Sequence, residues 1–367
     1  MQNNNIETFA KIIAEICTHS LIASDKSFDW IIIANPKAGG FMISSRWKNH
    51  YQALEKSLQR ARANPKRENA YPSPFAYDVE KNVLGENGLI LTKEVGYAKR
   101  ITHDFIEKSE KNFHLIITAG GDGTSLEVLI ALYHIPKEFR ENIAILRLPM
   151  GTGNDGSDAW ELDKALDLLI FPSKIEFGRA LRFKTQTESE YFYAFNILSI
   201  GVDAFVTHHT NKMKGRLPGD SYKLWVDVAA FFYDKIYKVA PIKVNAFDEE
   251  GNLLLSFEEI LLLLAMGVSG RRTYGSHKWI LPDERNVCAL KQMSLFRKLT
   301  LKEMINVGKH SNEKEAILFN AYKVEIQGKY PILAQMDGET MLLSPEDFPI
   351  TIKLTEPAIP FLSLPTA

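Results

Sequence analysis

The segment with the clearest chemical potential is Ala119-Gly120-Gly121-Asp122-Gly123-Thr124. It lies between an apolar run that predicts a strand and a run that predicts a helix. Its three glycines let the backbone approach a ligand closely and turn N–H groups toward an anion. The N-terminus of the following helix also favours a phosphate, and the Asp122 carboxylate could hold Mg²⁺ or a hydroxyl. The segment predicts a phosphate-binding turn, with a purely structural turn as the alternative.

Two further glycine-rich loops follow predicted strands. Asn35-Pro36-Lys37-Ala38-Gly39-Gly40 comes after the first strand, and Pro149-Met150-Gly151-Thr152-Gly153-Asn154-Asp155 comes after the fourth. The Asn35 side chain could fix its loop, and the glycines could line a nucleotide. Either loop alone is compatible with a structural turn. Three such loops at strand ends indicate a shared anionic ligand.

These loops need a scaffold, and the first half of the chain predicts one. We expect the following strands and helices: strands at 30–34, 89–92, 113–118 and 143–148, and helices at 42–59, 97–109, 125–133 and 162–169. Strands that alternate with helices are typical of a parallel, doubly wound sheet, which binds ligands at the carboxyl ends of its strands. Residues 61–88, rich in Pro and Asn, are interpreted as a surface loop or insertion of unknown role.

The pattern changes after Pro172. Short strand-like runs follow at 180–183, 191–200, 242–247, 260–266, 287–295, 321–326, 332–336 and 350–354, with one helical stretch at 222–237. Many short strands separated by turn signals predict an antiparallel β-rich sandwich or barrel-like domain. We place the boundary between the two domains near residues 172–176.

Composition limits the class of protein. The 367 residues are 45% hydrophobic and 24% charged, as in an ordinary globular protein, and the net charge is −1. This charge creates no strong field toward nucleic acid or anionic membranes. Cys17 and Cys288 are the two cysteines, so a disulfide framework is not expected and a reducing cytoplasm fits better.

The N-terminal residues lack the features of a signal peptide. The spacing of Phe9, Ile12, Ile13 and Ile16 predicts an amphipathic helix packed on the body, in preference to a membrane anchor. Apolar runs such as 260–266 are far shorter than the roughly 20 residues of a membrane span. We therefore expect a soluble, cytoplasmic protein that touches lipid only peripherally.

Taken in order, NPKAGG, GGDGT and PMGTGND resemble the three signatures of the diacylglycerol kinase catalytic domain. That superfamily includes sphingosine kinases, ceramide kinases and bacterial lipid kinases. Further segments extend the resemblance over about residues 29–355: Leu91-Thr92 followed by Ala98, Glu127, Phe195-Asn196, Ile200-Gly201-Val202-Asp203-Ala204 and Met336-Asp337-Gly338-Glu339.

The resemblance implies a Rossmann-like N-terminal domain, of the type that NAD kinases and diacylglycerol kinases share, and a β-rich C-terminal domain, with ATP and Mg²⁺ in the cleft between them. It implies four segments: an N-terminal helical extension (1–27), a nucleotide-binding α/β catalytic domain (28–174), a β-rich acceptor-binding domain (175–355) and a C-terminal tail (356–367). The implied reaction is transfer of the γ-phosphoryl group of ATP to a hydroxyl of a diacylglycerol- or sphingoid-like acceptor.

The resemblance also assigns residues. Those implied to contact nucleotide are Asn35, Pro36, Gly39, Gly40, Thr92, Gly120, Gly121, Gly123, Thr124, Glu127, Gly151, Thr152, Asn154 and Asp155. Asp122 would organise Mg²⁺ and the phosphates, and Asp337 would be the general base on the acceptor hydroxyl. Asp122 is the rival for the base, and an ordinary Asp-Gly hairpin turn is the other interpretation of residue 337.

Three features depart from the family pattern. Gly156-Ser157-Asp158 stands where the family has a hydrophobic or small residue, which puts acceptor access in question. The segment 281–286 replaces a glycine-rich acidic loop where some bacterial relatives hold a structural Mg²⁺; Asp283 is the candidate ligand, although a solvated charged turn is the preferred interpretation. The insertion at 61–88 is also unusual.

Other polar segments give weaker signals. Lys212, Lys214 and Arg216 could attract a lipid headgroup or a membrane surface, or form a plain basic loop. His208 and His209 lack a partner set for a metal and are interpreted as structural. Acceptor identity and a homodimer remain open, and no nucleic-acid partner is expected.

Three rival functions stay open. An NAD kinase-like small-molecule kinase shares GGDGT and a two-domain plan. A catalytically degenerate family member could bind nucleotide or lipid without turnover. A dinucleotide-binding oxidoreductase would use Gly151, Gly153 and Gly156 as GxGxxG, with Glu176 20 residues further on. This last pattern normally follows a first strand, whereas here it follows the fourth.

Overall fold

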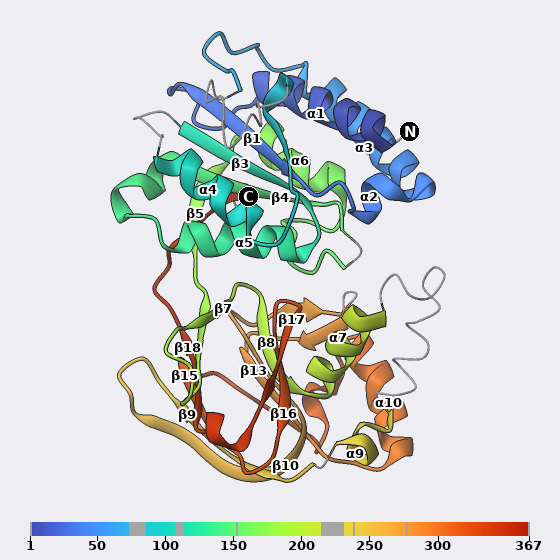
Figure 1. The fold of residues 1–367 in the computed structure, drawn as a ribbon, viewed down its shortest axis with the longest axis vertical. Coiled ribbons are helices and arrows are strands. Elements are labelled where there is room, and N and C mark those ends of the chain that lie inside the picture. The colour runs from blue at the N-terminus through green and yellow to red at the C-terminus, as the bar shows by residue number, and fades with distance from the viewer. Residues whose placement is uncertain are drawn as a thin grey trace. The chain divides into compact units, whose positions relative to one another are not determined.

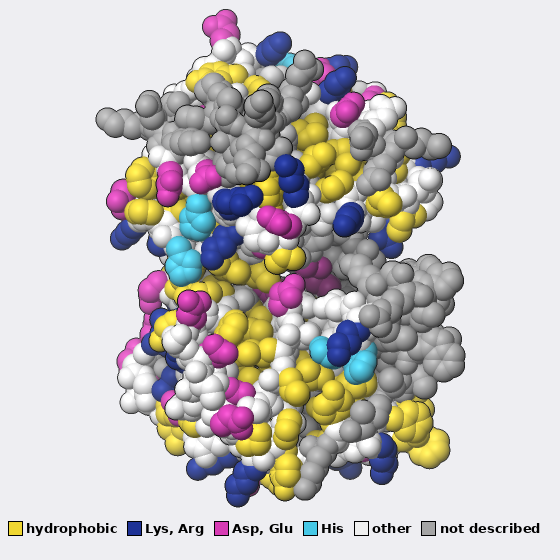
Figure 2. Space-filling model, viewed as in Figure 1, with side chains coloured by type: hydrophobic (Ala, Val, Ile, Leu, Met, Phe, Trp, Pro, Cys, Tyr) yellow, Lys and Arg dark blue, Asp and Glu magenta, His cyan; other side chains and the backbone are white. Residues whose placement is uncertain are grey.

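The computed structural model describes residues 2–72, 86–107, 113–151, 153–213, 231–237, 239–275 and 278–365. The chain divides into two compact units (Figure 1). The first unit comprises Met1–Gly178 and Pro357–Ala367, and the second comprises Arg179–Glu356. Basic and acidic side chains are interspersed over the visible face of each unit (Figure 2), in keeping with the net charge of −1.

The first unit is built on a six-stranded sheet with the order β2-β1-β3-β4-β19-β5. Its strands are β1 (Phe28–Ala34), β2 (Leu89–Leu91), β3 (Phe113–Gly120), β4 (Ile143–Pro149), β5 (Lys174–Gly178) and β19 (Ile359–Ser363). Its helices are α1 (Gln2–Thr18), α2 (Gly39–Met42), α3 (Ser44–Ala61), α4 (Tyr97–Glu107), α5 (Asp122–Tyr133) and α6 (Leu162–Ile170), with 3₁₀ turns η1 (Glu86–Gly88) and η2 (Lys137–Asn142). The pairs β1–β2, β1–β3, β3–β4 and β4–β19 are parallel.

Helices cover both faces of this sheet (Figure 1). On one face, α1, α3 and α6 form a core with alternate side chains of the central strands, including Trp30, Leu115 and Leu146. On the other face, α4 packs beside α5 (Figure 1). Because both faces are covered, every residue of β1 and β3 is buried, which explains their nearly continuous apolar sequences.

The predicted strands and helices of the first half are present, with shifted ends. The helix expected at 42–59 is α3, displaced by two residues at each end, and Ile43, with an extended backbone, separates it from the short helix α2. The helix expected near the N-terminus is α1, and Phe9, Ile13 and Ile16 on it are fully buried. It therefore packs on the body, as expected. None of the helices within the described residues is long and apolar enough to cross a membrane.

Two strands of the first unit were not predicted. β5 lies just after the expected change of pattern, and β19 lies within the range expected to be a C-terminal tail. β19 pairs in parallel with β4 and antiparallel with β5. The end of the chain therefore forms an interior strand of the first unit's sheet.

The second unit is dominated by antiparallel strands, eleven of which form one sheet in the described part of the chain. Its strands are β6 (Leu181–Lys184), β7 (Phe192–Ala194), β8 (Ile197–Gly201), β9 (Pro241–Phe247), β10 (Leu253–Gly267), β11 (Arg272–Tyr274), β12 (Lys278–Leu281), β13 (Val287–Lys291), β14 (Ala316–Phe319), β15 (Lys323–Gln327), β16 (Ile332–Met336), β17 (Glu339–Leu343) and β18 (Ile350–Leu354). Its helices are α7 (Val202–Met213), α9 (Tyr233–Ile236) and α10 (Leu295–Asn306), with 3₁₀ turns η3 (His310–Asn312) and η4 (Pro345–Asp347).

The long strand β10 curls this sheet. Residues 253–260 of β10 pair with β9, whereas residues 263–267 pair with β8 and residues 261–266 pair with β13. The register of β10 against β13 shifts between Leu261 and Leu263, and such an irregularity bends a strand. Figure 1 shows the curved β9–β10 ribbon along the edge of the unit. The fold class, an α/β unit followed by a β-rich antiparallel unit, is confirmed.

Some local predictions for the second unit were wrong. The strand expected at 287–295 ends at Lys291, and α10 begins at Leu295. The helix α7 was not predicted, although Val202–Met213 follows directly on β8. Most of the helix expected at 222–237 lies outside the described residues, as do residues 73–85 of the segment 61–88.

Candidate active site

The three glycine-rich loops meet within the first unit. They follow β1, β3 and β4, which are parallel neighbours in the order β1-β3-β4. The backbone N–H of Asn35 donates to the carbonyl of Ala119 (3.0 Å), and that of Gly40 donates to the carbonyl of Met150 (2.8 Å). The loops are therefore hydrogen-bonded to one another at one edge of the sheet, as their positions in the sequence predict.

The second and third loops touch through their glycines. A Cβ placed on Gly151 would lie 2.6 Å from the Cα of Gly121, and one placed on Gly40 would lie 2.9 Å from the carbonyl oxygen of Met150. Real Cβ atoms do not approach other atoms this closely, so both positions require glycine in this arrangement. The glycines therefore allow the loops to pack backbone against backbone.

Asp122 is the first residue of α5, and its carboxylate faces the loop after β4. Its Oδ1 accepts a hydrogen bond from the N–H of Gly156 (3.1 Å), and a Cβ on Gly153 would lie 2.9 Å from its Oδ2. A negative charge at a helix N-terminus is stabilised by the helix dipole. Asp122 thus links the GGDGT turn to the loop 150–158.

Side chains fix the internal shape of two loops. Asn35 Oδ1 accepts from the N–H of Lys37 (2.9 Å), so this asparagine holds its own loop, as predicted. Asn154 has φ of 60°, and its Nδ2 donates to the carbonyl of Pro149 (3.2 Å). The hydroxyl of Ser157 donates to the Asn154 carbonyl (2.7 Å). Thr152, named with this loop, lies outside the described residues.

Glu127 and Thr92 hold the loop that follows β2. The Glu127 carboxylate accepts from the N–H of Gly96 (2.7 Å) and from that of Ala98 (2.9 Å). These are N–H groups at the start of α4, which need acceptors from outside the helix. The N–H of Thr92 donates to the carbonyl of Ala34 (2.9 Å). In this structure Glu127 caps α4 and ties its first turn to α5.

Arg147 and Asp158 form a buried ion pair that sequence reasoning missed. Arg147 Nε and Nη2 donate to Asp158 Oδ1 (2.9 and 2.6 Å), and the Arg147 backbone N–H donates to Oδ2 (2.6 Å). Only 12% and 6% of the two side chains are exposed. The Arg147 guanidinium also lies 4.5 Å from the ring centroid of Phe361 on β19. Asp158, which departs from the family pattern, therefore anchors the loop 150–158 to β4. The arginine within the apolar segment ILRLP of β4 could have indicated a buried ion pair.

In the second unit, Asp337 and Gly338 form the two-residue loop between β16 and β17. Both have left-handed backbone, with φ of 47° and 101°, as a tight hairpin requires. The Asp337 carboxylate accepts from the backbone N–H groups of Phe195, Asn196 (3.1 Å) and Ile197 (2.9 Å). Such donors stabilise the ionised carboxylate. Asp337 is therefore both a turn residue and an anchor for the β7–β8 connection.

Two fully buried polar side chains near this turn, Ser199 and Gln335, were also missed. Asn196, which is buried, and the half-buried Asp203 at the start of α7 were named only as parts of segments that resemble the family. Ser199 and Gln335 sit within the apolar runs ILSIG and ILAQM. A polar residue at a core position of a strand is the signal that could have identified them.

Asp283, the weaker candidate for a metal ligand, forms an ion pair within the protein. Asp283 accepts from the backbone N–H and the guanidinium of Arg285 (3.0 and 2.9 Å), and this ion pair holds the pKa of Asp283 below its ordinary value. Among the described residues, no group of three or more His, Cys, Asp or Glu side chains could hold a metal ion.

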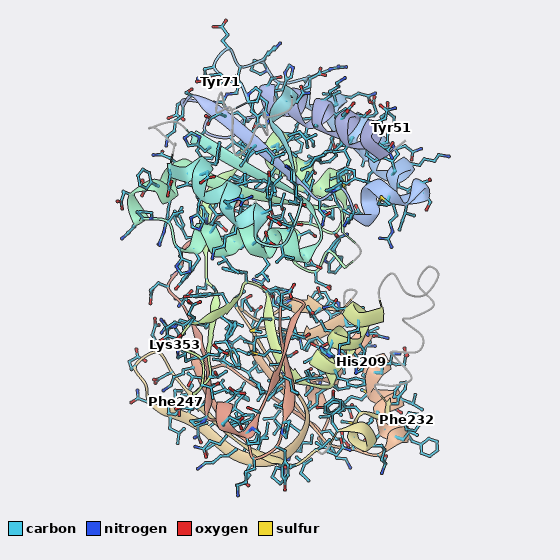
Figure 3. All side chains as sticks on the ribbon, in the orientation of Figure 1. Tyr51, Tyr71, His209, Phe232, Phe247 and Lys353 are labelled. Atoms are coloured by element: carbon cyan, nitrogen blue, oxygen red, sulfur yellow. The ribbon has the colours of Figure 1, made fainter. Side chains whose placement is uncertain are left out.

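The two histidines and the basic residues between 212 and 216 gave weaker signals as well. His208 Nδ1 pairs with Thr340 Oγ1 (3.0 Å), and His209, labelled in Figure 3, packs on Phe205. Lys212 is exposed near the end of α7, whereas Lys214 and Arg216 lie outside the described residues.

The arrangement in the first unit suits a nucleotide triphosphate with Mg²⁺. Glycine backbone and the N-terminus of α5 can face phosphate oxygens. Mg²⁺ commonly binds through one or two carboxylates together with substrate phosphates, and Asp122 offers one such carboxylate beside these loops. The residues present therefore fit the ion and the nucleotide that the resemblance implies.

The protein thus belongs to a class of two-unit folds. An α/β unit carries glycine loops at the carboxyl edge of its parallel strands, and a curled antiparallel β unit follows it. Residues 29–170 match the family model of the diacylglycerol kinase catalytic domain. The chain is 28% identical over 269 residues to a Yersinia enterocolitica protein named "Probable lipid kinase YegS-like", covering 71% of this chain and 82% of that protein. It is 25% identical over 260 residues to a diacylglycerol kinase of Bacillus subtilis, covering 67% and 78%.

A solved structure of a diacylglycerol kinase from Bacillus anthracis has the same fold. It aligns with a TM-score of 0.55 at 16% identity, over 92% of this chain and 97% of that one. The resemblance described above is thus confirmed, and the family is one of phosphotransferases of the lipid kinase type.

Proposed function

We propose that the protein transfers the γ-phosphoryl group of ATP to a hydroxyl of a diacylglycerol- or sphingoid-like lipid. The observation that carries this proposal is the mutual contact of three glycine loops, two of which Asp122 joins, in a segment that matches the diacylglycerol kinase catalytic domain. Contact with the membrane surface would be peripheral, and the protein would act from the cytoplasm. A homodimer is compatible with this function but not required by it.

Phosphoryl transfer depends mainly on alignment and on neutralisation of charge. Mg²⁺, when bound, would neutralise charge on the phosphate oxygens. Asp122 would hold the ion, and the backbone of Gly121, Gly123 and Gly151 would line the phosphates. The other proposed nucleotide contacts are Asn35, Pro36, Gly39, Gly40, Thr92, Gly120, Thr124, Glu127, Thr152, Asn154 and Asp155.

Asp337 would orient the acceptor hydroxyl and accept its proton. Three backbone N–H groups hold its carboxylate in place. Where the transition state is loose and the proton is transferred late, the reaction places a modest demand on such a base. Asp122 remains the rival for this role, because its carboxylate lies beside the proposed phosphate-binding loops.

The purified protein, incubated with Mg²⁺ and γ-labelled ATP, tests the function directly. Separate reactions would contain mixed micelles of diacylglycerol, sphingosine or ceramide, NAD, or no acceptor. We expect label in a lipid product identified by mass spectrometry. Label in NADP alone would instead establish a small-molecule kinase of the NAD kinase type. ATP binding without labelled product in any reaction would indicate a non-catalytic member of the family.

A further inference from the structure

A chain of hydrogen-bonded polar side chains, two of them fully buried, leads to the Asp337–Gly338 turn. Ser199 on β8 and Gln335 on β16 are opposite each other in the antiparallel register, and both are fully buried. Asp203 lies in the first turn of α7. Its Oδ2 accepts from the Ser199 hydroxyl (2.7 Å) and from Gln335 Nε2 (3.3 Å). The Gln335 Nε2 also donates to Ser199 Oγ (2.9 Å).

This pattern of donors and acceptors fixes the orientation of the Gln335 amide. An ionised carboxylate only accepts hydrogen bonds, so the Nε2 group of Gln335 must face Asp203 and Ser199. The Oε1 atom is then turned toward the hairpin, where it accepts from the N–H of Gly338 (3.0 Å). Because the Asp203 carboxylate accepts from Nε2 of Gln335, it is the Oε1 atom of Gln335 that faces the backbone N–H of the turn.

Further bonds hold the same turn. The Gly338 carbonyl accepts from Asn211 Nδ2 on α7 (2.8 Å), and the Asp337 N–H donates to the Ile197 carbonyl (3.2 Å). Asp337 has φ of 47°, a conformation that a non-glycine residue keeps when its surroundings hold it there. The backbone on both sides of the Asp337 side chain is therefore fixed by the network and by α7.

A buried polar network is a costly way to stabilise a sheet. Apolar side chains at 199 and 335 would pack against the same neighbours without burying an amide, a hydroxyl and part of a carboxylate. A fully connected network instead selects one geometry. The geometry selected here is that of the turn that carries Asp337.

We propose that Gln335, Ser199 and Asp203 are positioning residues for Asp337 in the transfer reaction. They hold the Asp337–Gly338 turn so that the carboxylate keeps the position from which it orients the acceptor hydroxyl. This inference rests on the proposed function, and it adds three residues of the second unit to the machinery of that reaction.

Two substitutions of Gln335 test the inference. Gln335→Met keeps the approximate volume but removes the side-chain hydrogen bonds to Gly338, Ser199 and Asp203. We expect kcat to fall roughly ten- to a hundredfold, as for a small misplacement of a reacting group, with KM for ATP nearly unchanged. Gln335→Glu keeps an acceptor for Gly338 but places a second carboxyl beside Asp203. At low pH the two neighbouring carboxyls can share a proton and form a hydrogen bond instead of repelling each other. The activity of Gln335→Glu should therefore recover as the pH falls.

Asn286→Ala is the matched control. Asn286 is buried in the same unit, but its side chain bonds to the backbone of Ala321 (2.9 and 3.0 Å), outside the network. This variant should lose stability without losing kcat, and its pH profile should follow that of the unaltered protein. A merely structural role of Gln335 would give the same result as Asn286→Ala.

Amide hydrogen exchange separates this inference from the proposed function. In Gln335→Met the amides of residues 195–197 and 337–338 should exchange about tenfold faster or more than in the unaltered protein, because the turn opens more often. If the unaltered protein phosphorylates no lipid, the proposed function fails while the exchange rates still report on the turn. Unchanged exchange together with unchanged kcat in Gln335→Met would overturn the inference.

Discussion

The backbones of Gly121 and Gly151 pass so closely that a methyl group on Gly151 would lie 2.6 Å from the Cα of Gly121. These two residues belong to loops that are separated by a helix and a strand in the sequence. Their contact means that the GGDGT turn and the loop after β4 form one continuous surface of backbone. The position of each loop therefore depends on the other, which has consequences for substitutions in either.

Gly151→Ala should impair this surface more than other glycine substitutions in the same loop. Its methyl group would meet backbone atoms, which cannot rotate away as a side chain can, so the loops must separate. We expect ATP binding to weaken at least tenfold and the free energy of unfolding to fall by about 1–3 kcal/mol. Isothermal titration and chemical denaturation would measure the two effects.

Gly156→Ala provides the comparison for that experiment. A Cβ there would lie 3.5 Å from Asp122 Oδ1 and 4.0 Å from Arg147 Nη1, which are ordinary contacts. The backbone N–H that donates to Asp122 would be retained. A loss of ATP affinity in Gly156→Ala as large as that in Gly151→Ala would show that the close approach is not what matters.

Asp122→Asn should lower turnover by about a hundredfold or more, with little loss of stability. The amide oxygen can still accept from Gly156, so the loop stays in place, but the charge that would hold Mg²⁺ is lost. Initial rates at increasing Mg²⁺ concentrations, alongside thermal unfolding, check this. Near-normal turnover at saturating ATP would remove Asp122 from the proposed mechanism.

Asp337→Asn should lower both turnover and stability. An amide has one acceptor oxygen, and its NH₂ group would face backbone N–H groups that the carboxylate now satisfies. Leaving such donors unpaired costs about 1–3 kcal/mol. Denaturation in urea measures this loss, and Glu339→Gln, at an exposed neighbour, serves as the control for stability. Equal stability of the two variants would contradict the anchoring role of Asp337.

Breaking the Arg147–Asp158 pair should destabilise the first unit strongly. Either Arg147→Leu or Asp158→Leu leaves a buried charge without its partner, at a cost of about 3–5 kcal/mol. The double variant should recover part of this loss, because neither charge remains. Denaturation of all four proteins forms the cycle.

The pair Lys174–Glu176, whose side chains are both 54% exposed, is the control for that cycle. Glu176→Gln should leave the denaturation midpoint unchanged, since solvent screens exposed ion pairs. Additive effects in the Arg147–Asp158 cycle would mean that the two side chains do not depend on each other.

His310 should make stability depend on pH. It is fully buried, and burial lowers its pKa below the ordinary value of 6.5. The unfolded state therefore takes up a proton at a higher pH than the folded state. Stability should be complete above about pH 6.5 and fall below it, by up to about 1.4 kcal/mol per pH unit, until the folded pKa is reached.

Denaturation at several pH values would measure this slope in the unaltered protein and in His310→Gln, which cannot titrate. We expect the decrease between pH 7 and pH 5 to be smaller in the variant. The same slope in both proteins would assign the effect to another group.

The sequence predicted the strands, helices and glycine loops that are marked by the spacing of neighbouring residues. The central strands of the first unit are apolar throughout because helices cover both faces, and the glycine loops at their ends mark the site. Gly121 and Gly151 were named individually, but their contact depends on the spacing of β3 and β4 in the sheet.

Long-range contacts account for most of what the sequence did not reveal. β19 is a strand because β4 and β5 lie on either side of it, and neither partner is near it in sequence. The Asp337 carboxylate is satisfied by backbone N–H groups about 140 residues earlier, and backbone partners leave no mark in a sequence. The network of Ser199, Asp203 and Gln335 likewise joins three elements that only the sheet brings together.

The return of β19 to the first unit has a consequence for synthesis of the protein. During translation, the whole of residues 179–356 emerges from the ribosome before the strand that fills the space between β4 and β5. The second unit can therefore complete its own sheet while the edge of β4 that pairs with β19 is still without a hydrogen-bonding strand. An unpaired edge can pair with a strand of another chain, so we expect a nascent chain stalled before Ile359 to aggregate more readily than the full chain.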